Sequence, residues 1–274
     1  MSIRARLAPV RHNRNNQMRV EDVGARVRVN GLSLSGFNPD RMSGMNYDGE
    51  VDMFSGYIFD VEGTLVDSVP QTLSSLQEAL EQAGFDIGYA TLQLYSGLDG
   101  DQTLQIIAPR LAASQRKQIL RAHAKIYQTK YLHYVKAFGG VREMFETLTR
   151  RGGRVALATD CKGPELKHYL SLLNIDEFIE VMACGDDVEH GKPDPRLVGL
   201  ALRKLGLTGS EAVMIGDTPY DAEAASGAGT AAAGVLTGGF SIDALRGAGC
   251  FAIADEVSRL LVSLDDAKSF GAGA

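Results

Sequence analysis

The feature that most constrains the fold is a regular alternation of strand and helix patterns that follows one early strand and a long helical stretch. YIFD (57–60) indicates a short buried strand, and apolar residues at helical spacing predict a helix over 70–83. Further strands are predicted at 154–159, 178–183, 212–216, 230–236 and, with a closing helix, within 250–263. Helical patterns fill the intervals between these strands, and this alternation is typical of a parallel sheet covered on both faces.

The helical patterns over roughly 101–135, added to the helix at 70–83, are too long to be a loop between the first two strands. We therefore expect an α/β protein with a Rossmann-like parallel sheet core and an inserted α-helical cap. The predicted core comprises residues 54–68 and 138–274, and the predicted cap comprises 69–137.

Residues 1–53 differ from the rest because they contain eight Arg against six acidic residues and hold no helical or strand period. We interpret this segment as a disordered tail. An upstream extension of the true start, or a basic anchor or targeting arm, is an alternative.

The net charge of −6 argues against a nucleic-acid-binding body. Three widely spaced cysteines are typical of a reducing compartment rather than of a disulfide framework. The uncharged stretch 224–242 is rich in Gly, Ala, Ser and Thr, so we interpret it as a helix end, strand and loop rather than a membrane span. A cytoplasmic protein without nucleic-acid or membrane partners is expected, and the oligomeric state stays open.

Polar side chains follow the predicted strands at the edge where ligands collect in open α/β sheets. Asp60, Thr159 and Asp217 come at strand ends, and Lys192 lies in the loop after the third strand. Two carboxylates, a hydroxyl and an amine suit a phosphate group.

A carboxylate that attacks a phosphate must overcome repulsion between anions, which Mg²⁺ and a lysine offset. Asp60, Asp217 and Asp221 offer the hard oxygen ligands that Mg²⁺ prefers. Attack by Asp60 would give an aspartyl-phosphate, which water then opens. Glu62 is the candidate acid/base, because side chains two apart on an extended segment point the same way.

Four segments carry a resemblance to a known family: DVEGTLVDS (60–68), ALATD (156–160), HGKPDP (190–195) and IGDTPYD (215–221). Their order and spacing resemble the four motifs of the haloacid dehalogenase-like (HAD) hydrolase superfamily over residues 57–261. The match is most similar to phosphatases with a helical cap after the first motif, a group that includes phosphoglycolate phosphatase and β-phosphoglucomutase.

The resemblance implies a Mg²⁺-dependent phosphatase of a small phosphorylated metabolite. It assigns Asp60 as nucleophile and metal ligand, and Glu62 as acid/base with its main-chain carbonyl on the metal. Thr159 and Lys192 become phosphate binders, and Asp217 and Asp221 become metal-site acids. A phosphosugar mutase, or an impaired phosphate-binding or regulatory protein, is the alternative.

Two residues depart from the family pattern. Glu62 stands where aspartate is usual, and its extra methylene moves the carboxylate by ~1.5 Å on a fixed backbone. We expect Mg²⁺ binding and phosphorylation of Asp60 to be retained, with slower turnover unless the pocket has adapted. Asp160 stands where Asn or Ser is common, which adds a negative charge to the predicted phosphate-binding set.

The loop GLDGD (97–101) resembles a cap loop that reaches over the active site in related phosphatases. Gly97 would allow a close approach of the loop to the core. Asp101 or Gln102 is a candidate for contact with the substrate, because loops commonly carry specificity.

Overall fold

The computed structural model describes the backbone of residues 54–271 and the side chains of residues 54–267. The predicted tail, residues 1–53, lies outside the described residues. Among the described helices, none is both long enough and apolar enough to cross a membrane.

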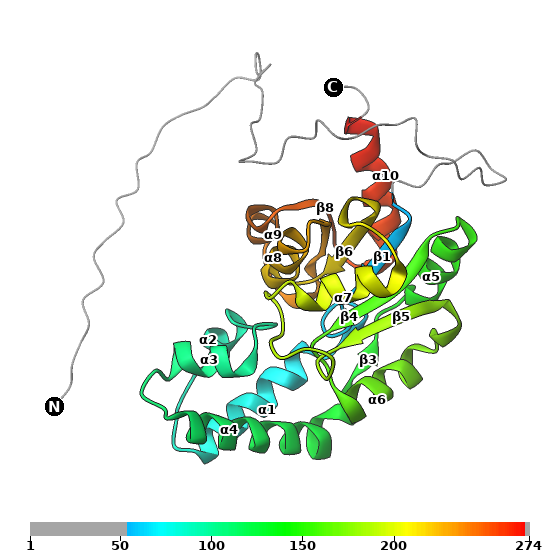
Figure 1. The fold of residues 1–274 in the computed structure, drawn as a ribbon. Helices are drawn as coiled ribbons and strands as arrows, with labels where there is room; N and C mark the ends of the chain where they lie inside the picture. Colours follow the sequence, from blue (N-terminus) through cyan, green and yellow to red (C-terminus); the bar gives the residue numbers. More distant parts are fainter. Residues whose placement is uncertain (1–53, 272–274) are drawn as a thin grey trace, which may run out of the picture. The chain divides into compact units, whose positions relative to one another are not determined.

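A six-stranded parallel sheet forms the centre of the described structure (Figure 1). Its first strand, β1, lies in the middle, with β4 and β6 as neighbours. The strand order across the sheet is β5 (Ile179–Cys184), β4 (Arg154–Thr159), β1 (Gly56–Phe59), β6 (Ala212–Gly216), β7 (Ala231–Val235) and β8 (Cys250–Ala254). The chain thus leaves β1 toward one side of the sheet and later crosses to the other, which creates a switch point at β1.

Side chains alternate between two apolar layers along the central strand. Tyr57 and Phe59 belong to one buried cluster, whereas Ile58 belongs to another on the opposite face. A strand that is buried on both faces reads as a continuous apolar run, and this explains the pattern of β1.

Helices cover both faces of the sheet. Residues of α5 (Val141–Arg150), α6 (Gly163–Leu173) and α10 (Leu260–Gly271) pack into the cluster of Tyr57 and Phe59. Residues of α7 (Arg196–Leu205), α8 (Pro219–Gly227) and α9 (Ile242–Ala248) pack into the cluster of Ile58. The predicted α/β fold with a Rossmann-like parallel sheet is confirmed.

The segment between β1 and β4 folds into a group of helices with its own apolar cluster, set beside the sheet in Figure 1. A two-stranded antiparallel pair closes its base, where Val66 pairs with Ala137 and Asp67 with Lys136. We propose that residues 69–137 form a cap domain, called the cap below. Its elements are α1 (Val69–Gln82), α2 (Tyr89–Gln93), α3 (Gly100–Ile107), α4 (Ala113–Ile126), a π-helical turn η2 (Tyr127–Tyr131) and a 3₁₀ turn η3 (Leu132–Tyr134); β2 (Val66–Asp67) and β3 (Lys136–Ala137) are the paired strands.

Two differences from the predicted elements have local causes. The helical pattern over 101–135 is interrupted because α3 ends at Ile107, two residues before Pro109, which lacks a main-chain donor. Helix α9 (Ile242–Ala248) was not predicted, and it begins at the last residue of the uncharged stretch 224–242. Its start is fixed by Ser241, whose hydroxyl accepts a hydrogen bond from Ala244 N at 3.2 Å. The remaining short 3₁₀ turns are η4 (Asp176–Phe178), η5 (Gly209–Glu211), η6 (Leu236–Gly238) and η7 (Val257–Arg259).

Candidate active site

Asp60 lies directly after β1, at the carboxyl edge of the sheet. Its main-chain N–H donates to Ile215 O at 2.9 Å, which extends the pairing with β6 by one residue. The side chain is buried, and its Oδ1 lies 2.7 Å from Lys192 Nζ. Burial raises the pKa of Asp60, while the nearby lysine opposes that shift.

Lys192 reaches this carboxylate from the loop between β5 and α7. Its Nζ lies 2.7 Å from Asp221 Oδ1 as well as from Asp60, and 3.8 Å from Asp160 Oδ2. Burial by itself would lower the pKa of Lys192, but the carboxylates of Asp221 and Asp60 outweigh it and raise the pKa. The ammonium is therefore a permanent positive charge at this edge of the sheet.

Asp217 follows β6 and is held by a threonine that the sequence analysis did not single out. Thr64 Oγ1 donates to Asp217 Oδ1 at 2.7 Å, and both residues are buried. The second oxygen, Oδ2, is buried without a hydrogen-bond partner. A Cβ built on Gly63 would lie 2.3 Å from Oδ2, and one on Gly238 would lie 1.9 Å from it. Glycine at both positions thus makes room for this carboxylate.

Asp221 lies in the first turn of α8. Its Oδ2 accepts hydrogen bonds from Thr218 N at 3.0 Å and from Thr218 Oγ1 at 2.7 Å, while Oδ1 accepts from Lys192. Together with the bond from Asp221 N to Thr218 Oγ1, these contacts form a capping box at the start of α8. The capping box therefore fixes the carboxylate that orients Lys192.

The carboxylates of Asp60, Asp217 and Asp221 form a compact acidic cluster. One oxygen from each lies within 4.8 Å of the others, and all three residues are buried. Burial, and then the charge of Asp221, raise the pKa of Asp217 to about 8. The raised pKa values favour protons on this cluster, and a divalent cation that binds the three carboxylates would displace those protons.

Thr159 is the last residue of β4, and Asp160 follows it. Thr159 Oγ1 accepts a hydrogen bond from Cys161 N at 3.2 Å, so its hydroxyl hydrogen remains available to a ligand. Asp160 Oδ1 accepts from the main-chain N–H of Lys192 at 3.1 Å, and a Cβ on Gly191 would lie 2.2 Å from the same oxygen. The carboxylate of Asp160 thus anchors the loop that carries Lys192.

Glu62 lies two residues beyond Asp60 and faces the same cavity. Its Oε1 accepts a hydrogen bond of 3.0 Å from the hydroxyl of Tyr169 in α6. Burial raises the pKa of Glu62 to about 7, and the hydrogen bond from Tyr169 opposes the shift. A carboxyl group with this pKa can donate or accept a proton near neutral pH.

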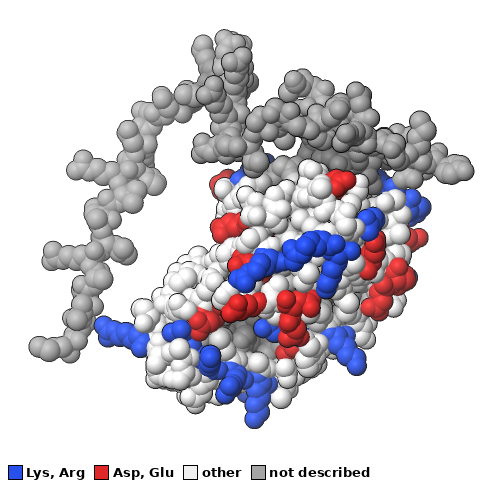
Figure 2. Space-filling model, in the orientation of Figure 1, with Lys and Arg blue, Asp and Glu red and all other residues white. Residues whose placement is uncertain are grey.

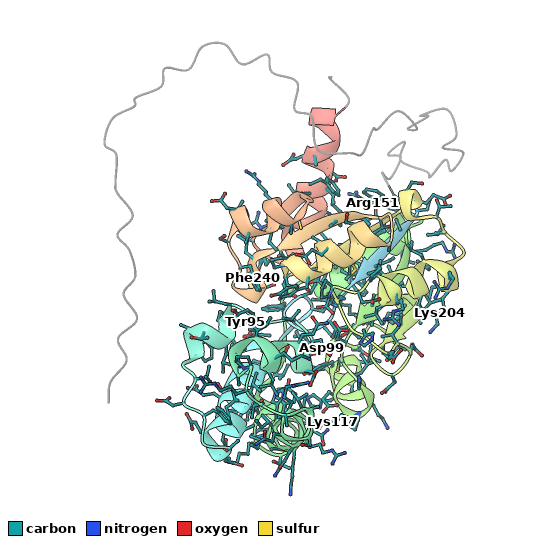
Figure 3. The ribbon with its side chains drawn as sticks, turned by 60° about the vertical axis from the view of Figure 1, so that its left-hand side comes forward. Tyr95, Asp99, Lys117, Arg151, Lys204 and Phe240 are labelled. Carbon is teal, nitrogen blue, oxygen red and sulfur yellow. The ribbon has the colours of Figure 1, made fainter. Side chains whose placement is uncertain are left out.

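A cavity of about 650 Å³ opens onto these groups between the cap and the core. Its wall includes Asp60, Glu62, Lys192 and Asp217 from the core, and the loop 96–101 from the cap. Figure 3 shows Asp99 of this loop between the helices of the cap and the core. A Cβ built on Gly97 would lie 2.6 Å from Thr218 Cγ2, so the glycine permits the close approach that the sequence predicted.

Asp101 lies at the edge of this cavity and is engaged within the cap. Its Oδ1 lies 2.7 Å from Arg116 Nε, and the ion pair contributes to a lowered pKa of Asp101. A contact between Asp101 and a substrate stays a prediction. On the face shown in Figure 2, acidic side chains lie near the centre, beside a band of Lys and Arg side chains, and also toward the edge.

The sequence analysis thus anticipated a convergence of Asp60, Lys192, Asp217 and Asp221, and the structure brings these four side chains together. It missed three side chains that hold the site: Thr64, Tyr127 and Tyr169. The sequence did contain a signal for Thr64. This hydroxyl residue lies only four positions after Asp60 and directly after Gly63, within the first of the four segments. Nothing in the local pattern marks either tyrosine, because both have helical surroundings.

Comparison with known proteins identifies the family of this chain. The family model described as haloacid dehalogenase-like hydrolase matches residues 57–235. The chain therefore belongs to the haloacid dehalogenase-like hydrolases, and the expectation of a phosphatase-type hydrolase is confirmed at the level of that family.

Three relatives illustrate the similarity. Pyrophosphatase PpaX of Bacillus velezensis is 28% identical over 190 residues, covering 65% of this chain and 81% of the relative. Phosphoglycolate phosphatase of Yersinia pestis is 29% identical over 188 residues, covering 67% of this chain and 81% of the relative. The crystal structure of a hydrolase from Pseudomonas syringae superposes with a TM-score of 0.72 at 30% identity, covering 77% of this chain and 98% of that one.

Proposed function

We propose that this protein is a Mg²⁺-dependent phosphatase that hydrolyses a small phosphorylated metabolite through an aspartyl-phosphate on Asp60. The observation that carries the proposal is the buried cluster of Asp60, Asp217 and Asp221, in which Lys192 contacts Asp60 and Asp221. Asp60, Asp217 and Lys192 line the cavity. A nucleophilic carboxylate, a phosphate-binding ammonium and oxygen ligands for a cation are the parts that phosphoryl transfer to an aspartate needs.

The residues present fit a magnesium ion. Asp217 Oδ2 is buried without a hydrogen-bond partner, and its two flanking glycines leave space beside it. Asp60, Asp217 and Asp221 would hold the ion, with the main-chain carbonyl of Glu62 as a further oxygen ligand. When bound, Mg²⁺ would neutralise charge on the phosphate and on the acids around it.

Asp60 and Glu62 divide the chemistry between them. A carboxylate oxygen of Asp60 forms a bond to phosphorus while the bond from phosphorus to the leaving oxygen breaks, and Glu62 gives its proton to that oxygen. In the second half, Glu62 takes a proton from water as the water oxygen bonds to phosphorus. The bond to Asp60 then breaks and releases phosphate, which returns both side chains to their starting states.

Thr159 and Lys192 are proposed to bind the transferred phosphate. The hydroxyl hydrogen of Thr159 is available, and the ammonium of Lys192 lies beside the nucleophile. Asp160 is proposed to act mainly by holding Lys192 in place, because its carboxylate accepts a hydrogen bond from the main-chain N–H of Lys192. Gly97 and Asp101 are proposed to face the leaving group from the cap loop.

The substrate is proposed to be small, in line with a cavity of about 650 Å³. The relatives' names refer to pyrophosphate and phosphoglycolate, and both compounds belong in a test panel. We also propose a cytoplasmic location, which the three free cysteines support.

Phosphate release from a panel of small phosphomonoesters and pyrophosphate, with and without Mg²⁺, tests the proposal. We expect Mg²⁺-dependent release by the native protein and a loss of at least about a thousandfold in Asp60→Asn, which removes the nucleophile. Phosphate exchange between two positions of a sugar, without net release, would instead identify a mutase. An inactive native protein that becomes active as Glu62→Asp would identify an impaired enzyme.

A further inference from the structure

The side chain of Glu62 ends in a hydrogen-bonded chain that crosses from the core to the cap. Tyr169 of α6 donates to Glu62 Oε1 at 3.0 Å, and the hydroxyls of Tyr169 and Tyr127 are themselves hydrogen-bonded. Tyr127 belongs to η2, the π-helical turn that follows α4 in the cap. The two phenols are 42 residues apart in sequence and belong to different parts of the molecule.

The direction of the chain follows from proton counting. A phenol has one hydrogen, and that of Tyr169 goes to the carboxylate, so Tyr127 must donate its hydrogen to the oxygen of Tyr169. Burial raises the pKa of both tyrosines, so both stay neutral and keep these hydrogens. The hydrogen bond from Tyr169 to Glu62 is therefore supported by the one from Tyr127 to Tyr169.

Neither phenol is placed to react with a substrate through its hydroxyl. Tyr169 is 0% exposed and packs within the apolar cluster of Tyr57 and Phe59. Tyr127 is 4% exposed and contributes to the cavity wall, but its hydroxyl is engaged with Tyr169. Their influence on chemistry would have to pass through Glu62.

The length of the Glu62 side chain lets its carboxylate reach the hydroxyl of Tyr169. An aspartate at this position would end ~1.5 Å short of the present carboxylate. Added to the observed 3.0 Å, that distance would carry its oxygens beyond hydrogen-bond range of Tyr169. The phenols therefore match a glutamate and do not match the shorter acid.

We propose that Tyr169 and Tyr127 are positioning residues that fit this active site to a glutamate acid/base and tie the placement of its carboxylate to the cap. The proposal rests on the proposed function, because it assumes that Glu62 transfers protons during turnover. A buried tyrosine pair that only stabilises the fold is the competing explanation.

Steady-state kinetics of Tyr169→Phe in two backgrounds separates these explanations. In the native background we expect kcat to fall about tenfold to a hundredfold because the carboxylate loses its fixed position, with KM changed less than about threefold. In the Glu62→Asp background we expect Tyr169→Phe to cost less than about threefold, since the contact is already lost. Tyr127→Phe should give a smaller loss of kcat of the same kind.

Tyr131→Phe is the matched control. Its hydroxyl donates to Glu78 Oε2 at 3.4 Å within the cap, so its removal should leave kcat within about twofold of the native value. Thermal melting of each variant checks that the loss of one oxygen leaves the fold intact. An unchanged kcat in Tyr169→Phe, or an equal loss in both backgrounds, would overturn the proposal.

NMR of protein labelled with ¹³C at tyrosine Cζ tests the contact without turnover. The resonance assigned to Tyr169, by its absence in Tyr169→Phe, should shift in Glu62→Asp and stay in place in Tyr131→Phe. If the enzyme is active but this resonance does not shift in Glu62→Asp, the positioning role is contradicted while the proposed function stands. A shift in a protein that releases no phosphate would contradict the proposed function and, with it, the catalytic purpose of the pair.

Discussion

At the scale of single residues, Asp217 shows how the site keeps one carboxylate oxygen free. Thr64 engages Oδ1, whereas Oδ2 is buried without a donor, and the glycines at 63 and 238 leave room beside it. Burial of such an oxygen costs free energy unless a cation binds it. The threonine is therefore expected to orient Asp217 for the metal rather than to touch substrate.

Replacing Thr64 with valine removes this hydroxyl at nearly constant volume. We expect Mg²⁺ affinity to fall about tenfold to a hundredfold, as is typical when a partner behind a metal ligand is lost. Isothermal titration with Mg²⁺ measures the change directly. Thr230→Val is the control, because Thr230 Oγ1 donates to Gly209 O at 2.6 Å outside the cavity wall. Equal Mg²⁺ affinity in native protein and Thr64→Val would contradict this role.

The residues proposed to carry the chemistry were easier to predict than the residues that hold them. Asp60, Lys192 and Asp217 follow strands, and parallel strands bring their ends to one edge. Thr64 and Tyr169 work through partners 153 and 107 residues away, so no local pattern reports their contacts. The fit of Glu62 to its surroundings could not be predicted for the same reason.

At the scale of elements, the cap loop depends on one glycine. Gly97 has φ of +82° and approaches Thr218, the residue next to Asp217. Gly84 has φ of +84°, but a Cβ there would meet nothing within 4 Å. Alanine at either position would strain the left-handed backbone to a similar extent. Only alanine at position 97 would also clash with the side chain of Thr218.

Gly97→Ala and Gly84→Ala therefore form a matched pair. Each should lose about 1–2 kcal/mol of unfolding free energy from the left-handed backbone. Only Gly97→Ala should also lose activity, about tenfold or more in kcat/KM, because the loop must move away from Thr218. Urea unfolding and steady-state kinetics measure the two effects, and equal activity losses in both variants would argue against a role for loop contact.

His123 makes the stability of α4 sensitive to pH. Burial lowers its pKa to about 4 from an ordinary value of 6.5, and a hydrogen bond to the main chain of Thr72 opposes the shift. The unfolded chain then binds more protons than the folded chain between these pH values. The free energy of unfolding is therefore not reduced by His123 above pH 6.5, and it is reduced progressively as the pH falls toward 4.

His123→Gln should flatten this part of the stability profile. Between pH 7 and 4.5 we expect the native protein to lose up to about 3 kcal/mol more than the variant. Urea unfolding at several pH values provides the comparison, and the difference between the two proteins removes contributions of other groups. Parallel profiles for both would show that His123 has the same pKa in the folded and the unfolded chain, and would contradict the shift.

Most core elements could be predicted, whereas the cap could be predicted only in outline. Strands 154–159 and 212–216 were predicted with their observed bounds, because buried parallel strands leave continuous apolar runs. Helix α9 contains only seven residues and a glycine, so its period is too short to detect. Helix α2, with five residues, escaped for the same reason.

At the scale of the whole molecule, charge around the cavity bears on substrate choice. Apart from the acidic cluster, Glu62 and Lys192, the charged residues of the cavity wall are the acids Asp99, Asp101, Asp160, Glu165 and Glu189 and the cation Lys162. His123, also in the wall, is neutral at pH 7. Leaving groups with a negative charge therefore enter an unfavourable field.

Matched substrates test this field. We expect ethanolamine phosphate to exceed phosphoglycolate in kcat/KM by about tenfold at low salt, and the ratio to shrink as added KCl screens the charges. Initial rates at two ionic strengths give both quantities. Faster hydrolysis of phosphoglycolate at every salt concentration would contradict the prediction and would align this chain with the activity named for its Yersinia relative.

The central claim is that Asp60 carries the phosphoryl group during turnover. The most direct measurement is to quench the protein during reaction with substrate and Mg²⁺, reduce the acyl phosphate with borohydride, and map the product by peptide mass spectrometry. The account predicts modification at residue 60 in native protein and none in Asp60→Asn. Phosphate release that continues in Asp60→Asn, or a modified residue elsewhere in the chain, would contradict it.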